Sequence, residues 1–308
     1  MELALITAQQ VAVLFILIFA GFICVKIGVI KMEGKKAFSD LLLYLVTPAM
    51  VINSYMTEFD TKVLANLLET LKLGTILLLA GIAVTMLLSV RIKDENCPIM
   101  RFACMFSNAA YMGFPLIQAL FGQEGLLYTS VFFTAFNILL WTVGYGMVSK
   151  KVHVKEIIRS ILTTPVIISV VIGLVIYLGR IPVPNIVKQP ISYIAGINTP
   201  LSMIITGMII AGCDVKKLLH NRLLMFVIAV RMFVIPALCL GLFMLFHVHG
   251  MIASIVLLLE SCPSAAITTV FAVQFKYDED LAAGAVVITT LLSIITLPVC
   301  AYLATTVL

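Results

Sequence analysis

Charged residues are scarce in this sequence. Asp, Glu, Lys and Arg make up 11% of the 308 residues, 62% are hydrophobic, and the mean hydropathy is +1.16. A water-soluble domain carries roughly twice that share of charge, so most of the surface must face lipid. Apolar stretches of about 20 residues recur, which is enough to cross about 30 Å of hydrocarbon as helix. The short alternating segments of a membrane β-barrel are missing. The sequence therefore predicts an all-α polytopic membrane protein.

Other absences narrow the function. The sequence has no Gly-rich phosphate loop and no Ser/His/acid arrangement within the spans, so neither an enzyme nor an ATP-driven pump is expected. Its seven cysteines are scattered without metal-ligand spacing, which predicts packing residues and neither a metal nor a cofactor. The net charge of +5 reflects membrane orientation better than a nucleic-acid partner. The first span lacks a cationic leader and a cleavage site, so we expect it to be retained.

Polar residues divide the chain into ten expected spans joined by short loops. The spans run over residues 8–30, 37–56, 67–90, 98–121, 125–148, 160–179, 187–212, 221–246, 251–275 and 281–306. Thirteen Lys and Arg residues fall in one set of alternate loops and four in the other. The positive-inside rule places the richer set in the cytoplasm. This predicts a multi-pass protein of the cell membrane with both termini outside.

The two halves of the chain carry similar segments in the same order, 148 to 155 residues apart. The clearest pair is LVTPAM (45–50) and INTPLS (197–202). Five spans are an odd number, so the second half must enter the membrane from the opposite side. The sequence thus predicts two inverted five-helix repeats, residues 1–149 and 160–308, joined by a short cytoplasmic linker, 150–159. Transporters use such symmetry, with binding sites near the midplane at discontinuous helices.

Helix-breaking residues interrupt the fourth and ninth expected spans. Gly113 and Pro115 lie in SNAAYMGFPL, and Pro263 lies in LESCPSAAITT. Proline removes a backbone N–H, and glycine tolerates backbone angles that other residues avoid. Irregular backbone at this depth is stable only inside protein or beside a wet cavity. We expect the pseudo-two-fold axis to bring the two breaks together, so that helices 4 and 9 cross.

Each break exposes the N-terminus of a half-helix. Free N–H groups and the positive end of the helix dipole then favour an anion, most simply a carboxylate. Asn108 can donate and accept hydrogen bonds beside it without adding charge. Hydroxyl groups on the other side come from Ser261, Ser264, Thr268 and Thr269. Unwound carbonyls could hold Na⁺ or lie near a proton site.

Glu260 stands just before the second break. A carboxylate exposed to lipid costs at least about 2.5 kcal/mol, so it should be paired or lie in a cavity. It is either a proton or Na⁺ coupling site or one half of a fixed salt bridge, for example to Arg231. Arg231 could instead attract an anionic substrate.

Three segments carry a resemblance to a known family. They are SDLLLYLVTPAMVINS in span two, SNAAYMGFPLIQALFG in span four, and ESCPSAAITTVFAVQFKYDEDLAAGAVVITTLLSIITLPV across spans nine and ten. Together they resemble the auxin efflux carrier family, in its bacterial branch, which is related to plant PIN-type transporters and to malate or malonate permeases. The resemblance covers essentially the whole chain.

The resemblance implies a fold similar to bile-acid symporters and sodium/proton antiporters. Helices 1, 2, 6 and 7 would form a scaffold, often dimeric, and helices 3–5 and 8–10 a transport domain. Asn108 and Asn137 match positions that contact a carboxylate substrate, and Pro115 and Pro263 match the crossover prolines. The long cytoplasmic loop of many plant members is missing, and Glu260 is not carried over from those members.

The sequence thus predicts a secondary transporter for a small organic carboxylate, auxin-like or malate-type, working by alternating access. H⁺ or Na⁺ is the expected coupling ion, and the expected partners are the anion, membrane lipid and a second copy of the chain. Two alternatives stay open: a cation/proton antiporter without an organic substrate, and a membrane sensor on a transporter fold. The expected substrate-binding residues are Asn108, Tyr111, Gly113, Pro115, Asn137, Pro263 and Ser264, with Glu260 and Ser261 for the coupling ion.

Overall fold

The computed structural model describes residues 2–150, 159, 162–213 and 221–307. This part of the chain is helical, and its only β-pairing is an isolated bridge between Ser107 and Ser264. The first half contains α1 (Glu2–Lys26), η1 (Met32–Gly34), α2 (Lys35–Leu41), η2 (Leu42–Val46), α3 (Thr47–Tyr55), α4 (Thr61–Ser89), α5 (Cys97–Met105), η3 (Ala109–Gly113), α6 (Phe114–Leu139), η4 (Leu140–Gly144) and α7 (Tyr145–Ser149). The second contains α9 (Pro165–Leu178), α10 (Asn185–Gly196), α11 (Asn198–Ala211), α13 (Arg222–Ala229), η5 (Val230–Val234), α14 (Ile235–Leu245), α15 (Met251–Ser261), α16 (Ile267–Phe275) and α17 (Glu279–Val307).

Many of these helices are long and apolar enough to cross a membrane, which makes the protein multi-pass. Seven such stretches lie within the described residues: Leu5–Lys26, Met32–Tyr55, Thr61–Ser89, Ala109–Ser149, Asn185–Ala211, Arg222–Leu245 and Glu279–Val307. Two shorter apolar helices, α9 and α15, lie within expected spans six and nine. Some span boundaries differ from the expected ones. The helix of the first expected span, α1, begins at Glu2 rather than at residue 8, and the helix of the third, α4, begins at Thr61 rather than at residue 67.

Expected spans four and five share one continuous helical stretch. Gly122, with φ 61° and ψ −146°, turns the backbone inside α6. A left-handed φ of this kind suits glycine, which has no Cβ to clash. The second part of span four and all of span five are therefore joined by a one-residue kink rather than by a loop.

Three prolines are each preceded by a π-helical turn. The turns η2, η3 and η5 end two residues before Pro48, Pro115 and Pro236 respectively. A proline ring lacks the N–H and clashes with the carbonyl one turn earlier, and a widened turn relieves both problems. The prolines thus loosen these helices locally without ending them.

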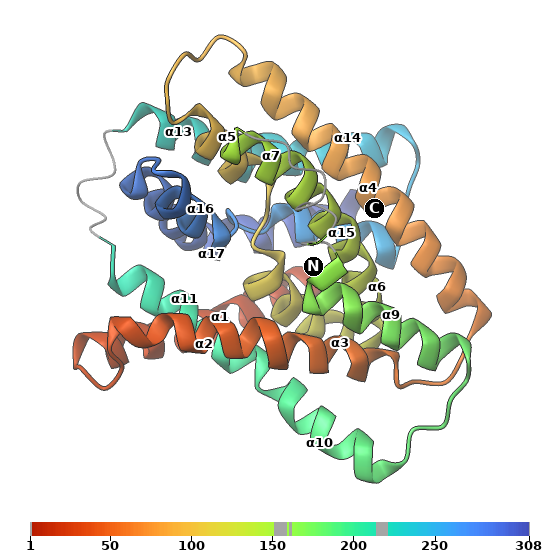
Figure 1. The fold of residues 1–308 in the computed structure, drawn as a ribbon. Coiled ribbons are helices and arrows are strands. Elements are labelled where there is room, and N and C mark those ends of the chain that lie inside the picture. Colours follow the sequence, from red (N-terminus) through yellow and green to blue (C-terminus); the bar gives the residue numbers. More distant parts are fainter. Residues whose placement is uncertain (1, 151–158, 160–161, 214–220, 308) are drawn as a thin grey trace.

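The helices form two groups in Figure 1. Helices α1, α2, α3, α9, α10 and α11 lie along the lower side, while α4, α5, α13, α14, α16 and α17 lie above them. Within the lower group, α1 packs along α11, and α3 packs against α9 and α10. Helix α6 contacts both groups, since it packs against α4 and α15 and also against α1 and α3.

Helices α1 and α11 approach each other backbone to backbone. A Cβ placed on Gly207 would lie 2.1 Å from the Ile18 carbonyl oxygen, and one on Gly21 would lie 2.5 Å from the Ile204 carbonyl oxygen. Small residues permit such close packing between membrane helices, where dispersion contacts replace the hydrophobic driving force.

Hydrogen bonds join loops that the charge pattern assigns to the same side. Asp278 N–H donates to Asn96 Oδ1 at 2.9 Å, and Tyr277 Oη donates to the Val148 carbonyl at 2.9 Å. On the other set of loops, Asp60 N–H donates to Tyr177 Oη at 3.0 Å, and Lys188 Nζ donates to the Met56 carbonyl at 3.2 Å.

Candidate functional site

Two interrupted helices lie side by side in the interior. The first break (residues 106–108) separates α5 from η3, and the second break (residues 262–266) separates α15 from α16. Their backbones run antiparallel: Asn108 N–H donates to the Pro263 carbonyl at 2.7 Å, and Ala265 N–H donates to the Phe106 carbonyl at 2.9 Å. Each break thus supplies backbone hydrogen bonds that the other lacks, which stabilises irregular backbone at this depth.

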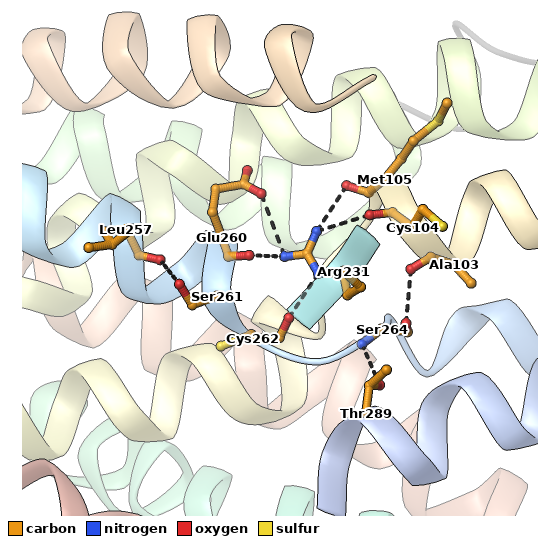
Figure 2. Close-up of polar contacts among 10 residues, drawn as sticks. All are labelled: Ala103, Cys104, Met105, Arg231, Leu257, Glu260, Ser261, Cys262, Ser264 and Thr289. Carbon is orange, nitrogen blue, oxygen red and sulfur yellow. Dashed lines mark hydrogen bonds and ion pairs between the residues drawn. The ribbon is translucent and has the colours of Figure 1, made fainter. Parts of the chain in front are cut away.

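Arg231 is the cation at the centre of this arrangement. It comes from η5, it is fully buried, and its guanidinium reaches carbonyls of both interrupted helices (Figure 2). From α15 it contacts the carbonyls of Cys262, at 3.0 Å, and of Glu260. From α5 it contacts those of Cys104 and Met105, at 3.3 and 3.4 Å. Carbonyls at a helix C-terminus carry negative partial charge, so one guanidinium caps two half-helices.

Glu260 is paired with Arg231, the partner that the sequence analysis named for it. Its Oε2 lies 3.6 Å from the Arg231 guanidinium, and both side chains are buried. The other carboxylate oxygen, Oε1, is buried and has no hydrogen-bond partner among the described residues. The pair therefore neutralises the arginine while leaving one acceptor free.

Unpartnered polar atoms gather at the two breaks. Within the described residues, six buried side-chain atoms lack a hydrogen-bond partner, and four belong to Ser107, Asn108, Glu260 and Thr268. Buried polar groups are normally paired, because an unsatisfied group costs about 1–3 kcal/mol. Their concentration around two adjacent breaks is the pattern of a site that completes its hydrogen bonds with a ligand.

Backbone N–H groups at the breaks are also free. Among the hydrogen bonds of the described residues, none engages the N–H of Ala109, Ala110, Tyr111, Ala266 or Ile267. These groups open η3 and α16, the half-helices that follow each break. Helix N-termini with free donors favour negative charge.

The remaining expected residues differ in their closeness to the breaks. Tyr111 is buried against Leu42, Val46 and Leu201 of the lower helix group and against Ala266 of the second break. Asn137 is buried on α6, where its Nδ2 donates to the Phe133 carbonyl at 2.8 Å. No hydrogen bond or ion pair between described residues joins Asn137 to either break.

The serines of the second break are held by backbone and by a threonine. Ser264 Oγ donates to the Ala103 carbonyl at 2.9 Å, and its N–H donates to Thr289 Oγ1 at 3.0 Å (Figure 2). Ser261 Oγ donates to the Leu257 carbonyl of its own helix at 2.7 Å. Ser264 therefore ties the second break to α5, and both hydroxyls keep only acceptor capacity for a ligand.

Gly113 has a different role from the expected one. Its φ of −65° and ψ of −53° are ordinary helical values, so unusual backbone angles do not explain the glycine. A Cβ there would lie 2.7 Å from Leu259 Cδ2, so the glycine permits η3 to pack closely against α15. Pro115 is buried at the start of α6, two residues after the π turn.

Several residues of this site escape sequence reasoning. Ser107 and Thr289 carry no signal, since single hydroxyls are common in membrane helices and usually bond to a carbonyl of the preceding turn. The Cys104 and Met105 carbonyls carry none either, because every residue has one. The sequence indicates only that an arginine within a membrane span needs hydrogen-bond acceptors, and it does not say which carbonyls supply them.

A cavity of about 540 Å³ lies beside the second break. Met32 and Lys35 line one side, and Thr269, Glu279 and Asp280 the other. Thr269 directly follows Thr268, whose buried hydroxyl has no partner among the described residues.

An all-helical, multi-pass membrane protein with a buried and partly unpaired polar site between interrupted helices is built as a membrane transporter. The profile of a family described as membrane transport protein matches residues 6–301, so the chain belongs to that family. This confirms the resemblance to the auxin efflux carriers and agrees with the prediction that the protein is not an enzyme.

Two archaeal relatives cover nearly the whole chain. An uncharacterized transporter of Methanocaldococcus jannaschii is 24% identical over 305 residues, covering 94% of this chain and 96% of its own. An uncharacterized transporter of Methanothermobacter thermautotrophicus is 22% identical over 300 residues, covering 95% of this chain and 96% of its own.

Proposed function

We propose that this protein is a secondary transporter that moves a small organic carboxylate anion, auxin-like or malate-type, across the cell membrane. One observation carries the proposal: free N–H groups and unpartnered polar side chains converge from two antiparallel breaks in a buried place. A carboxylate accepts several hydrogen bonds and carries the charge that two helix N-termini favour.

The anion would bind between the breaks. Asn108 Nδ2, a buried donor without a partner among the described residues, and the free N–H groups of η3 and α16 are its hydrogen-bond donors. Tyr111, Pro263 and Ser264 would line the site. Gly113 and Pro115 would fix the direction in which η3 continues into α6. Asn137 would join the site once its side-chain amide gave up the hydrogen bond to the Phe133 carbonyl.

Alternating access follows from a ten-helix, inverted-repeat topology with helices 4 and 9 crossing at the breaks. The antiparallel pairing of the breaks supports this topology. The packing of α1 along α11 and of α3 against α9 and α10 supports a scaffold of helices 1, 2, 6 and 7 beside a transport domain of helices 3–5 and 8–10, with α17 and α6 bridging the two (Figure 1). Movement of one group against the other would expose the breaks to each side in turn.

Glu260 is the group through which a cation, H⁺ or Na⁺, is coupled to the anion. Its Oε1 is the unpartnered acceptor where a cation would add, and its Oε2 keeps the contact with Arg231. Ser261 is the neighbouring hydroxyl. Loading a cation here lowers the negative charge that an incoming anion meets.

The scaffold would also form a homodimer, with both chain termini outside the cell. Its α10 exposes apolar side chains, including Ile186 at 84% and Tyr193 at 69%, which lipid or a second copy would cover.

The first experiment is thermal unfolding of the purified protein in detergent with a panel of mono- and dicarboxylates. A bound anion should raise the unfolding midpoint by about 2–4 °C for each kcal/mol of binding. Anions that stabilise are then tested for flux in proteoliposomes. Asn108→Ala should abolish both stabilisation and flux, because it removes the buried amide donor.

Asn66→Ala is the matched control. Asn66, on α4, donates to Tyr128 Oη of α6, so its loss removes an amide away from the breaks. Stabilisation and flux that persist in Asn108→Ala would contradict the site. Cation/proton exchange without any organic acid would favour the antiporter alternative.

A further inference from the structure

The carbonyl oxygens at the ends of α5 and α15 do not fit an alkali-metal coupling ion. Na⁺ coupling at interrupted helices uses unwound carbonyls and half-helix C-terminal ends as ligands. Where α5 and α15 end, these oxygens belong to Cys104, Met105, Glu260 and Cys262, and all four contact the Arg231 guanidinium. Arg231 uses all three of its nitrogens in these contacts, and Glu260 Oε2 adds a carboxylate to the same cage (Figure 2).

We infer that Arg231 is a built-in cation that takes the place of a coupling Na⁺, so that Na⁺ has no binding site among the carbonyls where α5 and α15 end. This deepens the proposed function, on which it rests, by assigning the cation specificity of the same site. An arginine stays charged at every physiological pH, so the place is permanently filled. H⁺ then remains as the cation that Glu260 can load.

The electrostatics of the cage support this assignment. Each half-helix C-terminus contributes about half a negative charge, and Glu260 contributes one more when ionised. A cation is therefore required where α5 and α15 end. The covalently attached guanidinium meets this requirement with planar, directional donors, whereas a spherical Na⁺ would need the same oxygens turned toward one point.

The test measures Na⁺ binding directly, without needing the identity of the substrate. The thermal unfolding midpoint of the wild-type protein is compared in sodium, potassium and choline chloride at equal concentration. We expect no Na⁺-specific stabilisation of the wild type. Arg231→Ser empties the cage and should gain a Na⁺-specific rise in midpoint of at least about 2 °C over choline.

Two further variants separate this role from general damage. Arg231→Lys keeps a cation in the cage and should stay insensitive to Na⁺. Arg101→Ser is the matched control, since Arg101 also bonds to a carbonyl and a hydroxyl, both of Ser89, away from the cage. It should show no Na⁺ response.

Na⁺-specific stabilisation of the wild type would overturn the inference, and so would a folded Arg231→Ser protein without a Na⁺ response. If Arg231→Ser gives no folded protein in any salt, the wild type and Arg231→Lys decide. A Na⁺ response in either overturns the inference, and none in both supports it. Failure of every carboxylate to bind would instead count against the proposed function and leave these Na⁺ measurements unaffected.

Discussion

Glu260 has two oxygens in different situations, and this difference governs its expected behaviour. Oε2 is held by Arg231, while Oε1 is buried without a partner among the described residues. A proton added to Oε1 would leave the contact with the guanidinium in place. The carboxyl group can therefore change its charge without dismantling the cage that Arg231 maintains.

Proton coupling through Glu260 should disappear in Glu260→Gln. A pH gradient of about one unit supplies about 1.4 kcal/mol per proton, or up to about tenfold accumulation of the anion. We expect wild-type proteoliposomes to show this accumulation and the glutamine variant to show only equilibration, because an amide cannot load a proton. Glu69→Gln, which alters an exposed carboxylate on α4, is the control. Accumulation retained in Glu260→Gln would place coupling elsewhere.

The sequence identifies the residues that are costly in a membrane. Glu260, Pro115 and Pro263 stand out because charge and helix-breaking residues need a reason at this depth. Gly113 is misinterpreted because its φ/ψ cannot be read from its identity, and the neighbour that requires it, Leu259, lies 146 residues away in the chain. Ser107 escapes notice because its buried hydroxyl becomes unusual only once its surroundings are known.

At the scale of helices, interruption and continuity follow from a few residues. The π turns before Pro48, Pro115 and Pro236 and the turn at Gly122 decide where helices bend. Proline positions indicate the bends from sequence, but the type of bend depends on packing. The sequence therefore predicts the interrupted spans well and their boundaries less well.

The contact between α1 and α11 yields a stability prediction. Gly207→Ala places a methyl group against the Ile18 carbonyl, so the two helices must separate, at a cost of about 1–3 kcal/mol. Gly241→Ala is the control, because a Cβ on Gly241 meets nothing within 4 Å. It should be neutral or slightly stabilising, since alanine favours helix over glycine. Thermal unfolding in detergent measures both, and equal midpoints for the two variants would contradict the packing argument.

At the scale of the whole molecule, the charge pattern predicts orientation. The loop that contains Arg91 and Lys93 belongs to the set rich in cations, and the loop at His247 and His249 to the other set. An epitope inserted after Val248 should be accessible to antibody on intact cells, and one inserted after Lys93 only after permeabilisation. The reverse result would invert the assigned orientation of both termini.

The buried guanidinium also has a consequence for biogenesis. Arg231 enters the bilayer with its helix before Glu260 and Cys262 have been synthesised, and an arginine at mid-membrane costs about 2.5–3.5 kcal/mol on insertion. Cys104 and Met105 are already in place by then, so their carbonyls are the first acceptors available to it. In a nascent chain halted before Met251, Arg231 would lack its partners Glu260 and Cys262 within the bilayer. Such a chain should be retained by the insertion machinery or degraded.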